Sequence, residues 1–165
     1  MINILVIGSG AREHAIIKSL NKSKKEKEIY CLASNNNPGI SDICKEMKII
    51  DVNDAQLIKD YSIKQSINIA IIGPENPLAH GVADSLWEAE VGVVGPKKNL
   101  AQIETSKSFT RNLLKEYNIP GCPKFKTFTS MKGVKGFLSL LGENYVVKYC
   151  LLYTSDAADE ERGVG

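Results

Sequence analysis

Residues 1–14 read MINILVIGSGAREH, and the fold that we expect follows from this stretch. Residues 2–7 form an apolar, β-branched run with one polar interruption, which is typical of a short buried strand. The run ends at Gly8 and Gly10, and a helical pattern of apolar residues follows at once. A strand that ends in glycines and opens a helix favours phosphate binding, because backbone N–H groups can approach an anion closely there. A tight turn that binds no ligand is the alternative.

The glycine pattern is an incomplete match to the fingerprint of dinucleotide-binding folds. Glu13 stands where that fingerprint requires a third glycine, which lets the helix pack closely on the strand. We expect a carboxylate at this position to fit poorly beside a pyrophosphate. The turn therefore favours a phosphate or a sugar phosphate over NAD.

Composition limits the class of protein. The chain has 165 residues, 43% of them hydrophobic, enough for one domain and the beginning of another. A net charge of +2 is too small to indicate a nucleic-acid or membrane partner, and four cysteines without CxxC spacing and two histidines indicate no metal site. The N-terminus lacks signal-peptide features, and no apolar run approaches the ~20 residues that span a bilayer. We expect a soluble cytoplasmic protein with reduced thiols.

Strand and helix patterns alternate along the first part of the chain, which predicts a doubly wound parallel sheet of the α/β class. Asp51 or Asn53 is the expected cap of the third helix. Ligands of such sheets bind beyond the carboxyl ends of the strands, in loops that here are residues 8–14, 34–39, 73–77 and 95–98. The predicted strands are residues 2–7, 29–32, 47–50, 68–72 and 92–95, and the predicted helices are residues 11–20, 41–45, 54–65 and 78–90.

The pattern changes after residue 96. Residues 100–117 form a long helical stretch that ends at the stop signal Asn-Ile-Pro-Gly. A break in this helix is expected near residues 104–106. Strands are predicted at residues 124–128 and 145–148, with a helix at 134–141. We expect an N-terminal α/β domain at residues 1–119 and the incomplete start of a second domain at 120–149.

Several segments together resemble the phosphoribosylamine–glycine ligase family, also called glycinamide ribonucleotide synthetase, of the ATP-grasp superfamily. The resemblance runs in order from residue 1 to about residue 148. The segments that carry it are GSGAREH (8–14), GPENPLAHGVADSL (73–86), GPKKNLAQIETSKSF (95–109), NIPGCPKFKTF (118–128) and YVVK (145–148).

The resemblance implies an ATP-dependent carbon–nitrogen ligase of purine biosynthesis. It would join 5-phosphoribosylamine to glycine through a glycyl phosphate, using ATP and Mg²⁺, with Mn²⁺ as a possible substitute, and would act as a monomer. Residues 1–119 resemble the Rossmann-like pre-ATP-grasp lobe that binds the sugar phosphate. Gly8, Ser9 and Gly10 would then approach the ribose phosphate, and Arg12 would offer it a fork of donors. An ordinary surface ion pair is the alternative for Arg12.

By the same resemblance, Glu75 would accept hydrogen bonds from two ribose hydroxyls, and Lys107 and Lys148 would bind the ATP phosphates. The alternative role for Glu75 is to cap the helix that is expected to begin near residue 78. Metal ligands and the glycine site are not expected in this chain.

After Lys148 the sequence departs from the family, and residues 150–165 read as the translation of a synthetic adapter, so we expect a non-native tail. We therefore expect the chain alone to be inactive. Two other functions remain as alternatives: a free-standing module that binds sugar phosphates or nucleotides, and a NAD-dependent dehydrogenase domain.

Overall fold

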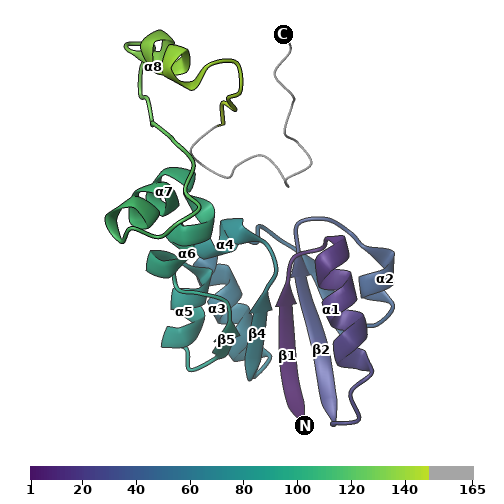
Figure 1. The fold of residues 1–165 in the computed structure, drawn as a ribbon. Coiled ribbons are helices and arrows are strands. Elements are labelled where there is room, and N and C mark those ends of the chain that lie inside the picture. The colour runs from purple at the N-terminus through teal and green to yellow at the C-terminus, as the bar shows by residue number, and fades with distance from the viewer. Residues whose placement is uncertain (149–165) are drawn as a thin grey trace. The chain divides into compact units, whose positions relative to one another are not determined.

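The computed structural model describes residues 1–148, so the expected tail at 150–165 lies outside the described residues (Figure 1). The chain forms two compact units that divide between Ala101 and Gln102. This division comes earlier than the predicted boundary after residue 119. The assignment of residues 1–119 and 120–149 as domains stays a prediction.

The first unit is a parallel sheet with the strand order β3-β2-β1-β4-β5, which confirms the predicted doubly wound α/β fold. Its strands are β1 (Ile2–Ile7), β2 (Lys27–Ala33), β3 (Glu46–Ile49), β4 (Ile69–Ile72) and β5 (Gly92–Val94). Its helices are α1 (Ala11–Asn21), α2 (Pro38–Ser41), α3 (Ala55–Lys64), α4 (Glu75–Ala79) and α5 (Val82–Glu88), and α6 (Lys98–Thr105) begins in it. Parallel pairing needs a crossover after each strand, and the helices provide the crossovers.

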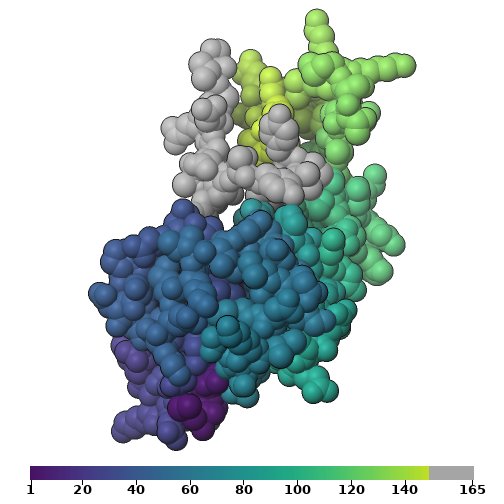
Figure 2. Space-filling view, turned by 180° about the vertical axis from the view of Figure 1, so that it is seen from behind, coloured from purple at the N-terminus to yellow at the C-terminus, as the bar shows by residue number. Residues whose placement is uncertain are grey.

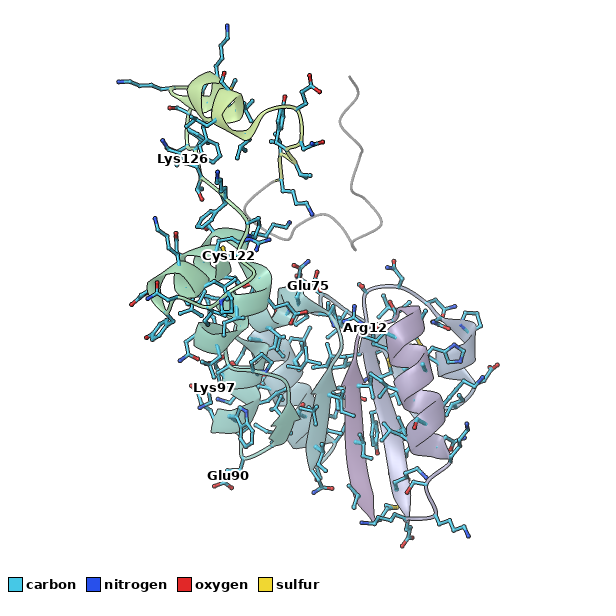
Figure 3. The ribbon with its side chains drawn as sticks, in the orientation of Figure 1. Arg12, Glu75, Glu90, Lys97, Cys122 and Lys126 are labelled. Carbon is cyan, nitrogen blue, oxygen red and sulfur yellow. The ribbon has the colours of Figure 1, made fainter. Side chains whose placement is uncertain are left out.

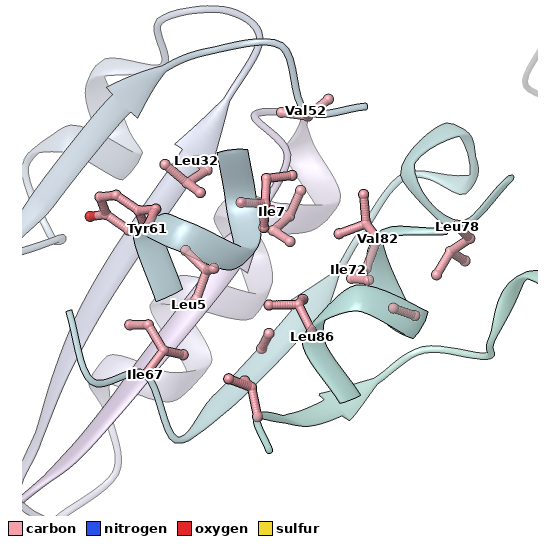
Figure 4. Packing of buried hydrophobic residues seen from close by; sticks show 14 of the residues in the cluster. Leu5, Ile7, Leu32, Val52, Tyr61, Ile67, Ile72, Leu78, Val82 and Leu86 are labelled. Atoms are coloured by element: carbon pink, nitrogen blue, oxygen red, sulfur yellow. The ribbon is translucent and has the colours of Figure 1, made fainter. Parts of the chain in front are cut away.

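Alternate residues of β1 point to opposite faces of the sheet, and the apolar side chains on both faces are buried. Helices therefore cover both faces. Leu5 and Ile7 pack in the larger cluster, with α3 and α5 on that face (Figure 4). Val6 packs in the smaller cluster with Ile17 of α1 and Ile40 of α2. Seen from behind, the purple β1 shows only at its lower end, because later residues cover it (Figure 2). The core therefore holds β1 in the middle of the unit.

Local capping moved several boundaries away from the predicted ones. The second helix begins at Pro38 and not at residue 41, because the Asn37 side chain accepts a hydrogen bond from the Ile40 N–H and proline suits the first helical turn. The expected helix at 78–90 is two helices, separated at Gly81, whose φ of 80° lies in the left-handed region. The expected cap of α3 was wrong, since Asp54 accepts from the Leu57 N–H.

The second unit has the helices α7 (Lys107–Glu116) and α8 (Val134–Leu141). The predicted break near residues 104–106 is confirmed, and Ser106 caps α7 by accepting from the Phe109 N–H. The strands predicted at 124–128 and 145–148 are wrong, because neither segment has strand structure. A strand is held by hydrogen bonds to a neighbouring strand, and the described part of this unit contains no paired strand.

Candidate functional site

The candidate site lies where the order of the strands reverses, at the carboxyl ends of β1 and β4. Ile7 pairs with Leu32 on one side and with Ile72 on the other, so three strands end at the same level. The loops that follow β1 and β4 leave toward opposite faces of the sheet. Figure 3 shows Arg12 and Glu75, from the first turns of the helices that follow these two loops, at this same end of the unit. Open parallel sheets bind their ligands at such a switch point.

The loop after β1 exposes the start of α1, although the N–H groups of its glycines already have partners. Gly8, with a φ of 119°, donates its N–H to the Leu32 carbonyl over 2.8 Å. Gly10 donates its N–H to the Glu13 carboxylate over 2.6 Å. These two N–H groups are therefore not available to a phosphate, and the remaining role for both glycines is to let the backbone come close to the ligand. The N–H groups of residues 11–13 remain as donors, because the first intrahelical hydrogen bond is the one from His14 to the Gly10 carbonyl.

Glu13, which we expected to fit poorly beside a pyrophosphate, faces the interior of the unit. Its side chain is buried, with 5% of the residue exposed, and it turns inward onto Gly10. The carboxylate therefore accepts the N-cap N–H of α1, which is the half of a capping box that a glycine N-cap allows. The space that a third glycine would leave open in a dinucleotide fold is filled by this side chain, which is a steric reason against NAD.

Arg12 connects the two loops. Its Nη1 donates to the carbonyl oxygen of Gly73 over 2.7 Å, and Gly73 directly follows β4. The alternative of a surface ion pair is wrong, because this partner is a neutral carbonyl group. Arginine carries five N–H donors in a planar fork, so the same guanidinium group can bind a second acceptor. Arg12 is exposed and could reach an anion at the start of α1.

Glu75 is the first residue of α4 and is partly buried. The alternative role as a helix cap is wrong, because Pro74 is the N-cap residue and α4 has no side-chain cap. Among residues 1–148, no hydrogen bond or ion pair occupies the Glu75 carboxylate. The group is therefore available to accept hydrogen bonds from a ligand.

The loop after β2, one of the loops expected near the ligand, contributes a contact that sequence reasoning did not predict. The Asn37 side chain donates to the Ser9 carbonyl over 2.9 Å while its oxygen caps α2. Ser9 is thereby held between β1 and the next loop. Asparagine before Pro-Gly is a typical helix cap, so the sequence contained a signal for the cap and none for the contact with Ser9.

A buried thiol of β2 forms a hydrogen bond with the loop that follows β1. The Cys31 Sγ donates to the Gly8 carbonyl over 3.3 Å. Burial raises the pKa of the Cys31 thiol to about 12, and it raises the pKa of the Cys44 thiol to about 11. Both thiols are therefore protonated at neutral pH, and Cys31 acts as a hydrogen-bond donor.

The two lysines expected to bind ATP belong to the second unit. Lys107 is the first residue of α7 and is partly buried, and Lys148 is exposed. No strand forms at residues 145–148, so Lys148 does not end a strand as expected. Their shared role stays a prediction.

Residues 1–148 contain neither a candidate metal site nor a helix that could cross a membrane. Within this range no three histidine, cysteine, aspartate or glutamate residues are grouped so that they could hold a metal ion. None of the helices described there has the length and apolar character needed to cross a membrane.

Solved structures with the same fold include two enzymes. N5-carboxyaminoimidazole synthetase from Staphylococcus aureus, complexed with ADP, matches with a TM-score of 0.70 at 15% identity, covering 91% of this chain and 39% of that chain. Phosphoribosylglycinamide synthetase from Anaerococcus prevotii matches with a TM-score of 0.58 at 14% identity, covering 84% of this chain and 34% of that chain. At these identities the likeness establishes the fold alone.

Sequence relatives are closer. The phosphoribosylamine–glycine ligase of Methanosarcina barkeri is 43% identical over 142 residues, which cover 86% of this chain and 33% of the relative. The chain thus spans about a third of the length of the curated relatives that it matches. Residues 2–104 match the family described as "Phosphoribosylglycinamide synthetase, N domain". Because this match covers most of the chain, the chain belongs to the phosphoribosylglycinamide synthetase N-domain family.

Proposed function

We propose that this chain is the N-terminal part of a phosphoribosylamine–glycine ligase and that its switch point binds the ribose phosphate of 5-phosphoribosylamine. The observation that carries the proposal is the Arg12–Gly73 hydrogen bond of 2.7 Å. It joins a helix start with free N–H donors to the loop that presents an available carboxylate. One ligand with both a phosphate and hydroxyl groups suits this pair of loops.

The chemistry of the two loops matches the two parts of the ligand. A phosphate at the start of α1 would accept hydrogen bonds from the first-turn N–H groups and from the unused donors of Arg12. Vicinal hydroxyls of the ribose would donate to the Glu75 carboxylate, which has two acceptor oxygens. The amine of the ligand would be held by its sugar, so that the reaction partner meets it in one orientation.

Use of ATP, Mg²⁺ and glycine belongs to the whole enzyme, which is longer than this chain. ATP would supply the phosphoryl group that activates glycine, and Lys107 and Lys148 would bind its phosphates. The described residues offer no set of Mg²⁺ ligands, so we assign none. We further propose that the whole enzyme works as a cytoplasmic monomer without a nucleic-acid partner. The chain alone is expected to form no glycinamide ribonucleotide.

NMR titration of the 165-residue chain tests the binding proposal. Ribose 5-phosphate should shift the amide signals of both loops, inorganic phosphate should shift those of residues 8–14 only, and NAD should not bind. Replacing Glu75 with glutamine puts N–H donors opposite the ribose hydroxyls. Loss of one charge-assisted hydrogen bond of about 1.5–3 kcal/mol should weaken ribose 5-phosphate about tenfold or more and leave inorganic phosphate unchanged.

Glu90→Gln is the matched control, because Glu90 is exposed and lies away from the carboxyl ends of the strands (Figure 3). It should change neither affinity. The proposal fails if the chain binds neither phosphate compound. Tighter binding of NAD than of ribose 5-phosphate would favour a dehydrogenase, and loss of both affinities in Glu75→Gln would contradict the role given to Glu75.

A further inference from the structure

The Glu13 side chain occupies a hollow between the two loops of the proposed site, and glycines form its walls. A Cβ atom added to Gly8 would lie 2.9 Å from the Glu13 Cγ, and one added to Gly10 would lie 2.8 Å from its Oε2. A Cβ atom on Gly73 would overlap Oε1 most severely of all. The glycines of both loops thus make room for one carboxylate.

Glu13 and Arg12, neighbours on α1, reach the same residue of the loop after β4 from two sides. Arg12 binds the Gly73 carbonyl at the surface, and Glu13 packs against the Gly73 backbone from within. The other oxygen of Glu13 accepts the Gly10 N–H over 2.6 Å. This last bond is enough for Glu13 to satisfy the N-cap N–H of α1, so the contact with Gly73 is an addition that involves a second loop.

We propose that Glu13 is a positioning residue that sets the spacing between the phosphate-binding loop and the loop that carries Glu75. It acts through these loops and does not touch the ligand. A ligand that must reach both loops, such as a ribose phosphate, depends on this spacing, whereas inorganic phosphate needs only the loop after β1. Glu13 therefore determines selectivity for sugar phosphate over phosphate. This inference rests on the proposed function.

Glutamine at position 13 keeps the length of the side chain and an acceptor for the Gly10 N–H, whereas alanine removes both contacts. We expect Glu13→Gln to keep the ratio of the phosphate Kd to the ribose 5-phosphate Kd within about twofold of the wild-type ratio. Glu13→Ala should lower that ratio about fivefold or more, because a flexible spacing penalises only the ligand that spans it. A variant that merely unfolds in part would weaken both ligands equally and leave the ratio unchanged.

The contact between Glu13 and Gly73 adds a second readout through a double-mutant cycle. Gly73→Ala should lower the ratio and the melting temperature in the wild-type background, because the new methyl group meets Glu13. In the Glu13→Ala background the same change should have little effect, since the atoms nearest to the added Cβ all belong to Glu13. The φ of Gly73 is outside the left-handed region, so alanine suits its backbone.

The ratio of the two Kd values is measured by NMR titration for the wild-type 165-residue chain and for each variant, and melting is followed by circular dichroism. The inference is overturned if Glu13→Ala leaves the ratio at its wild-type value, or if Gly73→Ala is equally harmful in both backgrounds. Should the wild-type chain bind neither ligand, the proposed function fails and this inference fails with it. A wild-type chain that binds both ligands, with an unchanged ratio in Glu13→Ala, refutes the role of Glu13 alone.

Discussion

Replacing Arg12 with lysine keeps the positive charge and removes the fork that lets one side chain bind two acceptors at once. In the structure Nη1 already donates to the Gly73 carbonyl over 2.7 Å. The remaining guanidinium donors are the ones that would bind a phosphate. A lysine ammonium group is compact and lacks the planar fork, so it cannot hold the Gly73 carbonyl and bind the phosphate with the geometry that arginine offers.

The expected size of the effect follows from this choice. The bond to Gly73 is exposed to solvent, so its loss should cost no more than about 1 kcal/mol of stability. Loss of one charge-assisted hydrogen bond to phosphate costs about 1.5–3 kcal/mol, or roughly a 10-fold to 150-fold weaker affinity. Arg12→Lys should therefore bind ribose 5-phosphate at least about tenfold more weakly while it stays folded.

Isothermal titration with ribose 5-phosphate measures the change, and urea unfolding shows that the variant is folded. Arg111→Lys, the same substitution on α7, is the control and should bind as the wild type does. An Arg12→Lys variant whose affinity stays within about twofold of wild type would refute the reasoning, because one lysine would then replace both functions of the fork.

Three further predictions concern stability and reactivity. The Tyr61 hydroxyl donates a hydrogen bond to the Glu46 carboxylate over 2.6 Å, which lowers the pKa of that carboxyl below its ordinary value. The contact therefore stabilises the fold at pH values above the pKa of Glu46 in the unfolded chain, and the stabilisation is lost as the pH falls through its pKa in the folded chain. Tyr61→Phe should thus cost about 1 kcal/mol at pH 7, and clearly less once the pH has fallen through the lowered pKa of Glu46, as measured by urea unfolding; equal costs would contradict this. Leu5→Ala, at a residue 0% exposed in the central strand, should lower the unfolding free energy by about 2–5 kcal/mol, whereas Ile49→Ala, at 61% exposed, should cost less than about 1 kcal/mol. Because the pKa of Cys31 is raised to about 12, its alkylation, followed by mass spectrometry, should be slow at pH 8 and faster with each rise in pH; rapid labelling at pH 7 in the folded chain would count against its burial.

Much of the fold was predictable from local pattern. The apolar run of β1 and the glycine turn after it predicted the first strand and α1, and the regular alternation predicted the parallel sheet. The break before α7 was visible as well, because serine at position 106 is a good cap. Where a boundary depends on a side chain reaching a particular N–H group, as at Asn37 and Asp54, the pattern of apolar residues carried no information about it.

The strands predicted at residues 124–128 and 145–148 show the limit of local pattern. Alternating or apolar residues indicate that a segment can be a strand, but a strand exists only when a neighbour accepts its hydrogen bonds. The described part of the second unit contains no such neighbour. Lys148 ends the second of these segments, and its role in binding ATP stays a prediction.

By itself the sequence determined the α/β class, the glycine turn and the residue types near a phosphate, because these depend on short-range periodicity and on the chemistry of single side chains. Only the tertiary structure decided which way each side chain faces. It turned Glu13 inward between Gly8 and Gly73, and it joined Arg12 to a carbonyl group sixty-one residues away in the sequence. Contacts of this kind depend on the order of strands in the sheet, which places the ends of β1 and β4 side by side and leaves no trace in the local sequence.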